Sequence, residues 1–225
     1  LLATGARVVA IERDPRCVAA LAPLVHWAGG RLSVIEADAL SIDLAELARA
    51  ERIDQPWAVV ANLPYNIGTE LLVRWLHRLD VVAAMHLMLQ KQVVLRLAAQ
   101  PGSASYGRLS VLAQSLCRVR RLFDLPAGAF QPPPKVTSAL VELIPHPLAD
   151  RPDDQTLAAL EDVAKAAFGQ RRKMLRSSLR SLTAEPEALL ASAGIAPERR
   201  AQTLNLEEFA HLAQRWQLKA GGETV

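Results

Sequence analysis

The chain has 225 residues, of which 51% are apolar and 22% charged, and its net charge at pH 7 is +3. This composition provides enough apolar sequence for one domain of ordinary size and a small second one, and it excludes a disordered chain. The small net charge indicates no particular partner, so any basic surface must be local.

The cysteines and the apolar runs exclude several further classes of protein. Cys17 and Cys117 lie far apart in the sequence, and neither belongs to a CxxC pair or has a histidine at metal-ligand spacing. No apolar run approaches the ~20 residues that a membrane span requires. We therefore expect a cytoplasmic protein with two reduced thiols, no structural metal and no membrane contact.

The first two thirds of the chain alternate between short apolar strands and helices. Strands are expected at 7–11, 31–35, 57–61, 83–89, 120–125 and 137–144. Helices are expected at 15–24, 43–52, 69–79, 91–97 and 109–116. Strands that are apolar on both faces and alternate with helices predict an α/β domain with a doubly wound, mostly parallel sheet.

A second, all-α domain is expected after this α/β domain. Pro145-His146-Pro147 and Arg151-Pro152 interrupt the chain, so we place a boundary near 148–152. Beyond it the period is helical at 154–168, 171–182, 185–193 and 205–218. The sequence thus predicts a first domain of residues 1–148 and a small helical domain of residues 152–225.

Polar residues end the first three expected strands, where an open parallel sheet binds its ligands. Glu12, Asp38 and Asn62 follow these strands in turn. A carboxylate can accept hydrogen bonds from both hydroxyls of a ribose, and the next acid could accept from the amine of an adenine. Each acid alone is as well explained as a helix cap. Together they indicate a nucleoside site, without separating NAD from S-adenosylmethionine.

The segment Asn62-Leu63-Pro64-Tyr65 favours S-adenosylmethionine. It could be no more than a turn that ends a strand. Alternatively, the Asn62 side-chain oxygen and a backbone carbonyl held by Pro64 could accept both protons of an exocyclic amine, while Tyr65 stacks on the base. That arrangement would free the lone pair of adenine N6 to attack a methyl sulfonium.

Here the sequence resembles a known family, the ribosomal RNA adenine dimethyltransferases of the small-subunit type. The similarity spans residues 6 to about 215 and follows the order of the family's motifs. The matching segments are Val9–Asp14, Glu36–Ala39, Asn62–Ile67, Met88–Val94, Tyr106–Val111, Phe130–Ala139 and Ala167–Arg176.

The resemblance implies a Rossmann-like class I methyltransferase domain that uses S-adenosylmethionine and no metal. It places Glu12 on the cofactor ribose, Asp38 with Ala39 at the cofactor adenine, and Asn62 at both the cofactor and the target base. Tyr65 and Phe130 would stack on the target adenine, although a Phe before three prolines is otherwise more typical of a packing anchor. The implied reaction is N6,N6-dimethylation of two adjacent adenosines near the 3′ end of 16S rRNA, with the small ribosomal subunit as partner. Nothing in the sequence suggests another obligate partner, so we expect a monomer.

A local basic run lies between Val163 and Ala184, which contains six basic residues and no acid. On a helix over 171–182, Arg172, Arg176 and Arg180 would share one face. A solvated helix surface usually interleaves acids, so the run favours contact with rRNA phosphates. The residues expected to bind RNA are Arg108, Lys135, Arg171, Arg172, Lys173, Arg176 and Arg180.

The family's Gly-rich loop, which lies against the methionine part of the cofactor, has no counterpart in these 225 residues. We therefore expect that the sequence is a fragment lacking its N-terminal segment, and that by itself it binds S-adenosylmethionine poorly in a calorimetric titration. Three alternatives remain open at this point: a methyltransferase acting on large-subunit rRNA, a non-catalytic rRNA-binding assembly factor, and an NAD oxidoreductase, which leaves Asn62-Leu63-Pro64-Tyr65 without a role.

Overall fold

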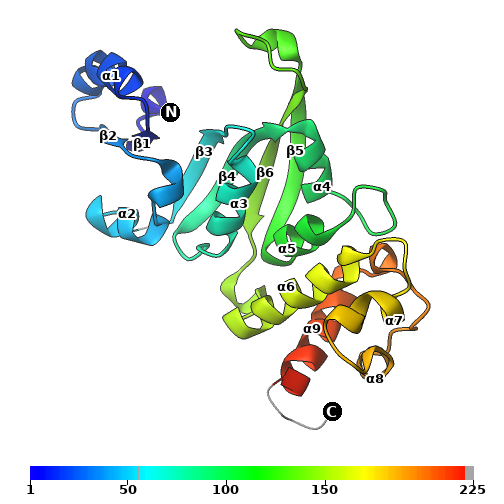
Figure 1. The fold of residues 1–225 in the computed structure, drawn as a ribbon. Coiled ribbons are helices and arrows are strands. Elements are labelled where there is room, and N and C mark those ends of the chain that lie inside the picture. The colour runs from blue at the N-terminus through cyan, green and yellow to red at the C-terminus, as the bar shows by residue number, and fades with distance from the viewer. Residues whose placement is uncertain (55, 221–225) are drawn as a thin grey trace. The chain divides into compact units, whose positions relative to one another are not determined.

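The computed structural model describes residues 1–54 and 56–220, and its ribbon is drawn in Figure 1. The chain forms two compact units: unit 1 comprises Leu1–Trp57 and Asn66–Val81, and unit 2 comprises Ala58–Tyr65 and Val82–Val225. These units do not divide at 148–152, so the two-domain boundary stays a prediction. The predicted second domain, residues 152–225, also includes residues 221–225, which lie outside the described residues.

Unit 1 is built on a pair of parallel strands. β1 (Val8–Glu12) and β2 (Leu32–Glu36) pair in register from Val8 with Leu32 to Glu12 with Glu36. Parallel neighbours need a crossover connection, which α1 (Pro15–Trp27) provides. Unit 1 also contains α2 (Leu44–Ala50) and α3 (Gly68–Leu76).

The sheet of unit 2 has the order β3-β4-β6-β5, seen side by side in Figure 1. Its strands are β3 (Trp57–Asn62), β4 (Val82–Gln90), β5 (Cys117–Leu125) and β6 (Ser138–Pro145). α4 (Lys91–Leu97) and α5 (Arg108–Leu116) connect β4 to β5.

The α/β class is confirmed, and the sheet of unit 2 is mixed because it includes the antiparallel strand β6. β6 is antiparallel to both β4 and β5. β4 and β5 are therefore parallel to each other, as their helical crossover requires. β5 reaches β6 through residues 126–137, which hold a single 3₁₀ turn and no crossover helix. That hairpin connection forces the antiparallel direction of β6.

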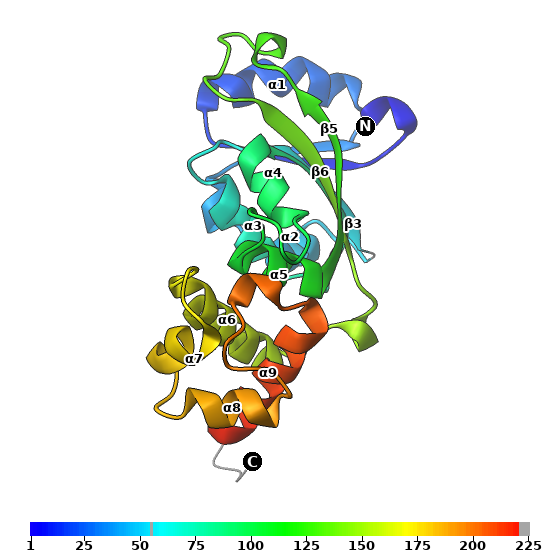
Figure 2. The same ribbon diagram turned by 90° about the vertical axis from the view of Figure 1, so that its right-hand side faces the viewer.

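The core of unit 2 lies on one face of this sheet. Alternate residues of β4 and β6 are at most 1% exposed, namely Met85, Leu87, Leu89, Ala139, Val141 and Leu143. α4 packs against β4, β5 and β6, and it lies with α5 on one side of the β5–β6 ribbon (Figure 2). In the described chain Val60 and Phe123 are more than half exposed. Exposure also alternates along β3 and along most of β4, so their period is two and the prediction of strands buried on both faces is wrong here.

The helical part of unit 2 contains α6 (Asp154–Gly169), α7 (Leu175–Ser178), α8 (Pro186–Ser192) and α9 (Leu206–Ala220). α6 packs against α9, where Phe168 stacks on Phe209 with ring centroids 5.6 Å apart. Tyr106, from the loop before α5, meets Phe168 edge-on at 5.9 Å.

The helix expected over 171–182 is interrupted. Residues 171–173 form a turn, α7 begins only at Leu175, and a 3₁₀ turn follows at Leu179–Ser181. Two backbone donors explain the late start, because Leu175 N–H bonds to the Arg199 carbonyl at 2.7 Å and Arg176 N–H bonds to the Pro197 carbonyl at 3.1 Å. Bonds to a distant segment therefore override the local helical period.

We expect the stability contributed by Glu208 to depend on pH. Its carboxylate accepts from the Arg199 guanidinium and from Asn205 N–H, and the Arg199 bond is the main cause that lowers its pKa below the usual value. A lowered folded pKa stabilises the folded state above the unfolded pKa, and this contribution is lost as the pH falls through the folded value.

Glu208→Gln should therefore lower the free energy of unfolding by about 1 kcal/mol at pH 7, measured in urea, because it weakens a charge-assisted bond. The difference from wild type should shrink below pH ~4, where the unaltered carboxyl is itself becoming protonated. Glu207→Gln is the matched control, because Glu207 is the exposed neighbour on the same turn of α9. An equal loss for both variants, or a loss that persists at low pH, would contradict the prediction.

Candidate functional site

Asn62-Leu63-Pro64-Tyr65 leaves the sheet of unit 2 at the carboxyl end of β3. Asn62 is the last residue of β3 and is exposed. Leu63 is 5% exposed, and its N–H bonds to the Met88 carbonyl at 3.1 Å. Leu63 therefore anchors the segment to β4, while the exposed Pro64 carries the chain away from the sheet. The expected turn at the end of a strand is thus present, with the Asn62 side chain available at its edge.

Tyr65 is half-buried and has a partner on another strand. Its hydroxyl lies 2.6 Å from Oγ of Ser138, and Ser138 is 1% exposed. Ser138 is the first residue of β6, where it pairs with Gln90 of β4 and Leu125 of β5. The sequence indicated a stacking role for Tyr65 but not this hydrogen bond, because Ser138 lies 73 residues further along the chain.

A group of charged side chains lies at the same end of the sheet. Asp124, near the end of β5, accepts from Nζ of Lys91 at 2.8 Å and from Arg121 at 2.6 Å. The Arg121 guanidinium first, and then Lys91, hold the pKa of Asp124 below its usual value. Lys91 N–H also bonds to the Thr137 carbonyl at 2.9 Å. The sequence pointed to none of these charged residues as a site. Arg121 and Asp124 are neighbours on β5, whereas the strand order brings Lys91 to them.

Phe130 and Lys135 lie on the loop of residues 126–137 that joins the ends of β5 and β6. Phe130 is half-buried and Lys135 is exposed. A 3₁₀ turn at Ala127–Ala129 precedes Phe130, whose N–H bonds to the Ala127 carbonyl at 3.2 Å. Because both ends of this loop are held by the sheet, the structure brings Phe130 to the same end of unit 2 as Asn62 and Tyr65.

The predicted cofactor residues of unit 1 form a set of their own. Glu12 ends β1, and its Oε1 accepts from Asp14 N–H at 2.8 Å. Asp38 follows β2, accepts from Leu40 N–H at 2.9 Å, and lies 3.5 Å from the Arg13 guanidinium. Asp38 therefore caps the 3₁₀ turn Ala39–Ser41, the structural role that the sequence left open. Each acid uses a carboxylate oxygen to order its own loop and remains partly exposed.

The predicted RNA-binding residues of the helical part are all exposed, but they do not share one helix. Arg172 and Lys173 lie in the turn before α7, Arg176 lies on α7, and Arg180 lies in the 3₁₀ turn. The prediction that Arg172 shares a helical face with Arg176 and Arg180 is therefore wrong. Arg176 makes a long ion pair with Glu198, at 3.9 Å.

Arg171 has structural partners, whereas Arg108 has no side-chain hydrogen bond or ion pair with the described residues 1–54 and 56–220. The Arg171 guanidinium donates to the carbonyls of Ala104 and Tyr106, at 2.9 and 2.7 Å. It thereby joins the end of α6 to the loop before α5. Arg108 is the first residue of α5 and is exposed.

Residues 1–54 and 56–220 contain neither a metal-binding cluster nor a membrane-spanning helix. No group of three or more His, Cys, Asp or Glu side chains is placed to hold a metal ion among these residues. No helix within the same ranges is long and apolar enough to cross a membrane.

Comparison with known proteins matches nearly the whole chain. The family model described as ribosomal RNA adenine dimethylase covers residues 2–218. A protein of Rhodospirillum rubrum named ribosomal RNA small subunit methyltransferase A is 51% identical over 215 residues, which are 95% of this chain and 72% of that protein. Its namesake from Mesorhizobium japonicum is 54% identical over 217 residues, which are 94% of this chain and 76% of that protein.

Two solved structures share the fold at low sequence identity. A dimethyladenosine transferase from Plasmodium falciparum has a TM-score of 0.76 at 20% identity, over 96% of this chain and 83% of that one. The 23S rRNA methyltransferase ErmE has a TM-score of 0.65 at 22% identity, over 93% of this chain and 81% of that one. With the family model covering residues 2–218 and relatives half identical to it, the chain belongs to the ribosomal RNA adenine dimethylase family.

Proposed function

We propose that this protein transfers methyl groups from S-adenosylmethionine to N6 of two adjacent adenosines near the 3′ end of 16S rRNA, forming N6,N6-dimethyladenosine in the small ribosomal subunit. The observation that carries the proposal is the segment Asn62-Leu63-Pro64-Tyr65, held by Leu63 at the carboxyl end of β3. The family match and the names of the half-identical relatives support the same substrate. They favour it over a large-subunit enzyme, since ErmE is similar in fold at 22% identity.

Asn62 and Pro64 would act on the target amine. The lone pair of adenine N6 is delocalised into the ring and is a poor nucleophile. The Asn62 side-chain oxygen and a backbone carbonyl fixed by Pro64 would accept the two N6 protons and favour the form whose lone pair can attack. Tyr65 and Phe130 would stack on the flipped base. The proton released after alkylation passes to solvent, so no general base is needed.

Glu12 and Asp38 would hold the cofactor, with Ala39 beside its adenine. S-adenosylmethionine supplies the methyl group on a sulfonium. The residues fit this ligand because Glu12 ends β1 and Asp38 follows the parallel strand β2. Both carboxylates are partly exposed and can still accept hydrogen bonds from a ribose diol or an amine.

The proposal predicts that label from methyl-tritiated S-adenosylmethionine enters small subunits lacking the modification. The assay uses the product of the whole reading frame that contains these 225 residues, with the 225-residue chain run in parallel. Asn62→Ala should lower kcat by about 100-fold or more, because it removes an acceptor that acts on the reacting nitrogen. Primer extension should map the label to the two adjacent adenosines.

If the product of the whole reading frame transfers no label to small subunits, or transfers label only to large subunits, the proposed function is refuted. Binding of immature subunits without any transfer would instead support a non-catalytic assembly factor.

We also propose that Arg172 and Arg176 bind rRNA phosphates, together with Lys173, Arg180, Arg108 and Lys135. Arg172→Ala plus Arg176→Ala should weaken binding of the 225-residue chain to small-subunit rRNA. It should also reduce the slope of log affinity against log salt by about 1 to 2, since each phosphate contact contributes roughly 0.7–0.9. Filter binding at several salt concentrations measures both quantities.

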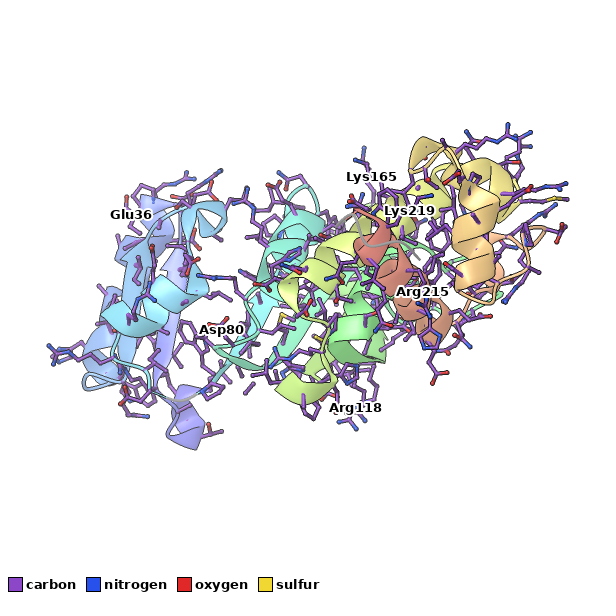
Figure 3. The ribbon with its side chains drawn as sticks, turned by 90° about the horizontal axis from the view of Figure 1, so that it is seen from below. Glu36, Asp80, Arg118, Lys165, Arg215 and Lys219 are labelled. Atoms are coloured by element: carbon purple, nitrogen blue, oxygen red, sulfur yellow. The ribbon has the colours of Figure 1, made fainter. Side chains whose placement is uncertain are left out.

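Arg215→Ala plus Lys219→Ala is the control for net charge, because both residues lie on α9, as labelled in Figure 3. This pair removes the same two positive charges and should leave the slope near wild type. If the two double variants lowered the slope equally, general charge rather than these arginines would be responsible. If neither changed it, the proposed RNA contacts would be refuted.

The proposed function also includes an oligomeric state and a location in the cell. We propose a monomer that acts in the cytoplasm, where Cys17 and Cys117, both free in the structure, would stay reduced. Light scattering at micromolar concentration tests the monomer, and a dimer would refute it.

A further inference from the structure

The hydrogen bond between Tyr65 and Ser138 has no part in the function described so far. We propose that Ser138 is a positioning residue, which fixes the ring plane of Tyr65 so that the target adenine meets a preformed stacking surface. This inference rests on the proposed function, since it assigns the ring to the adenine of that reaction. The contact itself is a 2.6 Å approach of two hydroxyl oxygens within unit 2.

Ser138 is suited to this role because its own position is fixed on both sides. It begins the inner strand β6 and pairs with Gln90 on one side and Leu125 on the other. The preceding residue, Thr137, accepts a hydrogen bond from Lys91 N–H at 2.9 Å. With 1% of its surface exposed, Ser138 has little freedom to move.

Tyr65, in contrast, needs an external support. It lies beyond the end of β3 in a turn and is only half-buried. Its side chain starts after β3 and its hydroxyl ends at β6, two strands away in the order β3-β4-β6. A ring held at its Cβ and at its hydroxyl has lost most of its torsional freedom. The hydroxyl is also occupied, so the face of the ring is what Tyr65 offers to a base.

Ser138 fixes the Tyr65 ring before the substrate binds, so the loss of this hydrogen bond should be measurable in the kinetics. A preformed ring spares the entropy of ordering a side chain when the base arrives. Ser138→Ala frees the tyrosine hydroxyl, and Tyr65→Phe removes it while leaving Ser138 in place. Each variant should lower kcat for methyl transfer by about 3- to 10-fold, as expected for one hydrogen bond. KM for the small subunit should change by less than twofold, because phosphate contacts dominate that binding.

The double variant shows whether Ser138 acts through Tyr65 or whether the two residues affect kcat independently. If Ser138 acts only through Tyr65, Ser138→Ala plus Tyr65→Phe should be no slower than the slower single variant. Ser138→Thr retains a hydroxyl and should restore most of kcat. Ser178→Ala is the matched control, because Ser178 is a serine that is 2% exposed, and its hydroxyl bonds to the Leu175 carbonyl on α7. It should keep wild-type kcat and should show no coupling to Tyr65→Phe.

NMR can detect the hydrogen bond between Tyr65 and Ser138 independently of activity. The chain has two tyrosines, and Tyr106 is 0% exposed. With tyrosine labelled by ¹³C at Cζ, Tyr65→Phe identifies the Tyr65 signal by removing it. Ser138→Ala should shift that signal and leave the Tyr106 signal in place. Thermal unfolding of every variant checks folding, and if Ser138→Ala does not fold, Tyr65→Phe still tests the loss of kcat.

The outcomes separate this inference from the proposed function. Two results with an active wild type would overturn the positioning role alone. One is that the losses of kcat in the two single variants multiply in the double variant, and the other is that Ser138→Ala leaves the Tyr65 signal unshifted. A Tyr65→Phe variant with wild-type kcat would overturn it as well. If the unmutated product of the whole reading frame, in which these variants are made, transfers no methyl, the proposed function is overturned, and with it the assignment of the ring to adenine.

Discussion

The insertion of β6 between β4 and β5 is the constraint on which the candidate site of unit 2 depends. Because β6 is antiparallel to both neighbours, its first residue lies beside the last residues of β4 and β5. Ser138, Lys91 and Asp124 therefore meet at one end of the sheet although they are far apart in sequence. The segment Asn62–Tyr65 leaves β3 at the same end, where Leu63 bonds to β4 and Tyr65 reaches Ser138.

Asp124, Arg121 and Lys91 help to fix the elements at this end of the sheet. Hydrogen bonds from Arg121 and Lys91 favour the ionised form of Asp124 and hold its pKa below the usual value. An ionised Asp124 ties the end of β5 to the start of α4, and the Lys91 backbone ties α4 to Thr137. Both ends of the loop that carries Phe130 are thus fixed by ion pairs and hydrogen bonds, while the loop between them remains accessible.

The helical part of unit 2 is joined to the sheet through the connection between α4 and α5. Arg171 donates to two carbonyls of this connection, and Gly102 N–H bonds to the Gln202 carbonyl at 2.7 Å. Tyr106 packs its ring against Phe168 and is fully buried, so desolvation raises its pKa to about 12. Within the basic run, Arg171 therefore supports the fold, whereas Arg172, Lys173, Arg176 and Arg180 are exposed to solvent.

The sequence by itself determined most of the helices and strands, because strand and helix periods are local signals. It located α4, α6 and α9 to within two residues, and it placed Glu12 and Asn62 at the ends of strands and Asp38 just after one. Only the tertiary structure decided that β6 runs antiparallel, that α7 starts at Leu175, and that Tyr65 is held by Ser138. Each of these depends on hydrogen bonds between segments distant in the chain, and no local period encodes such pairing.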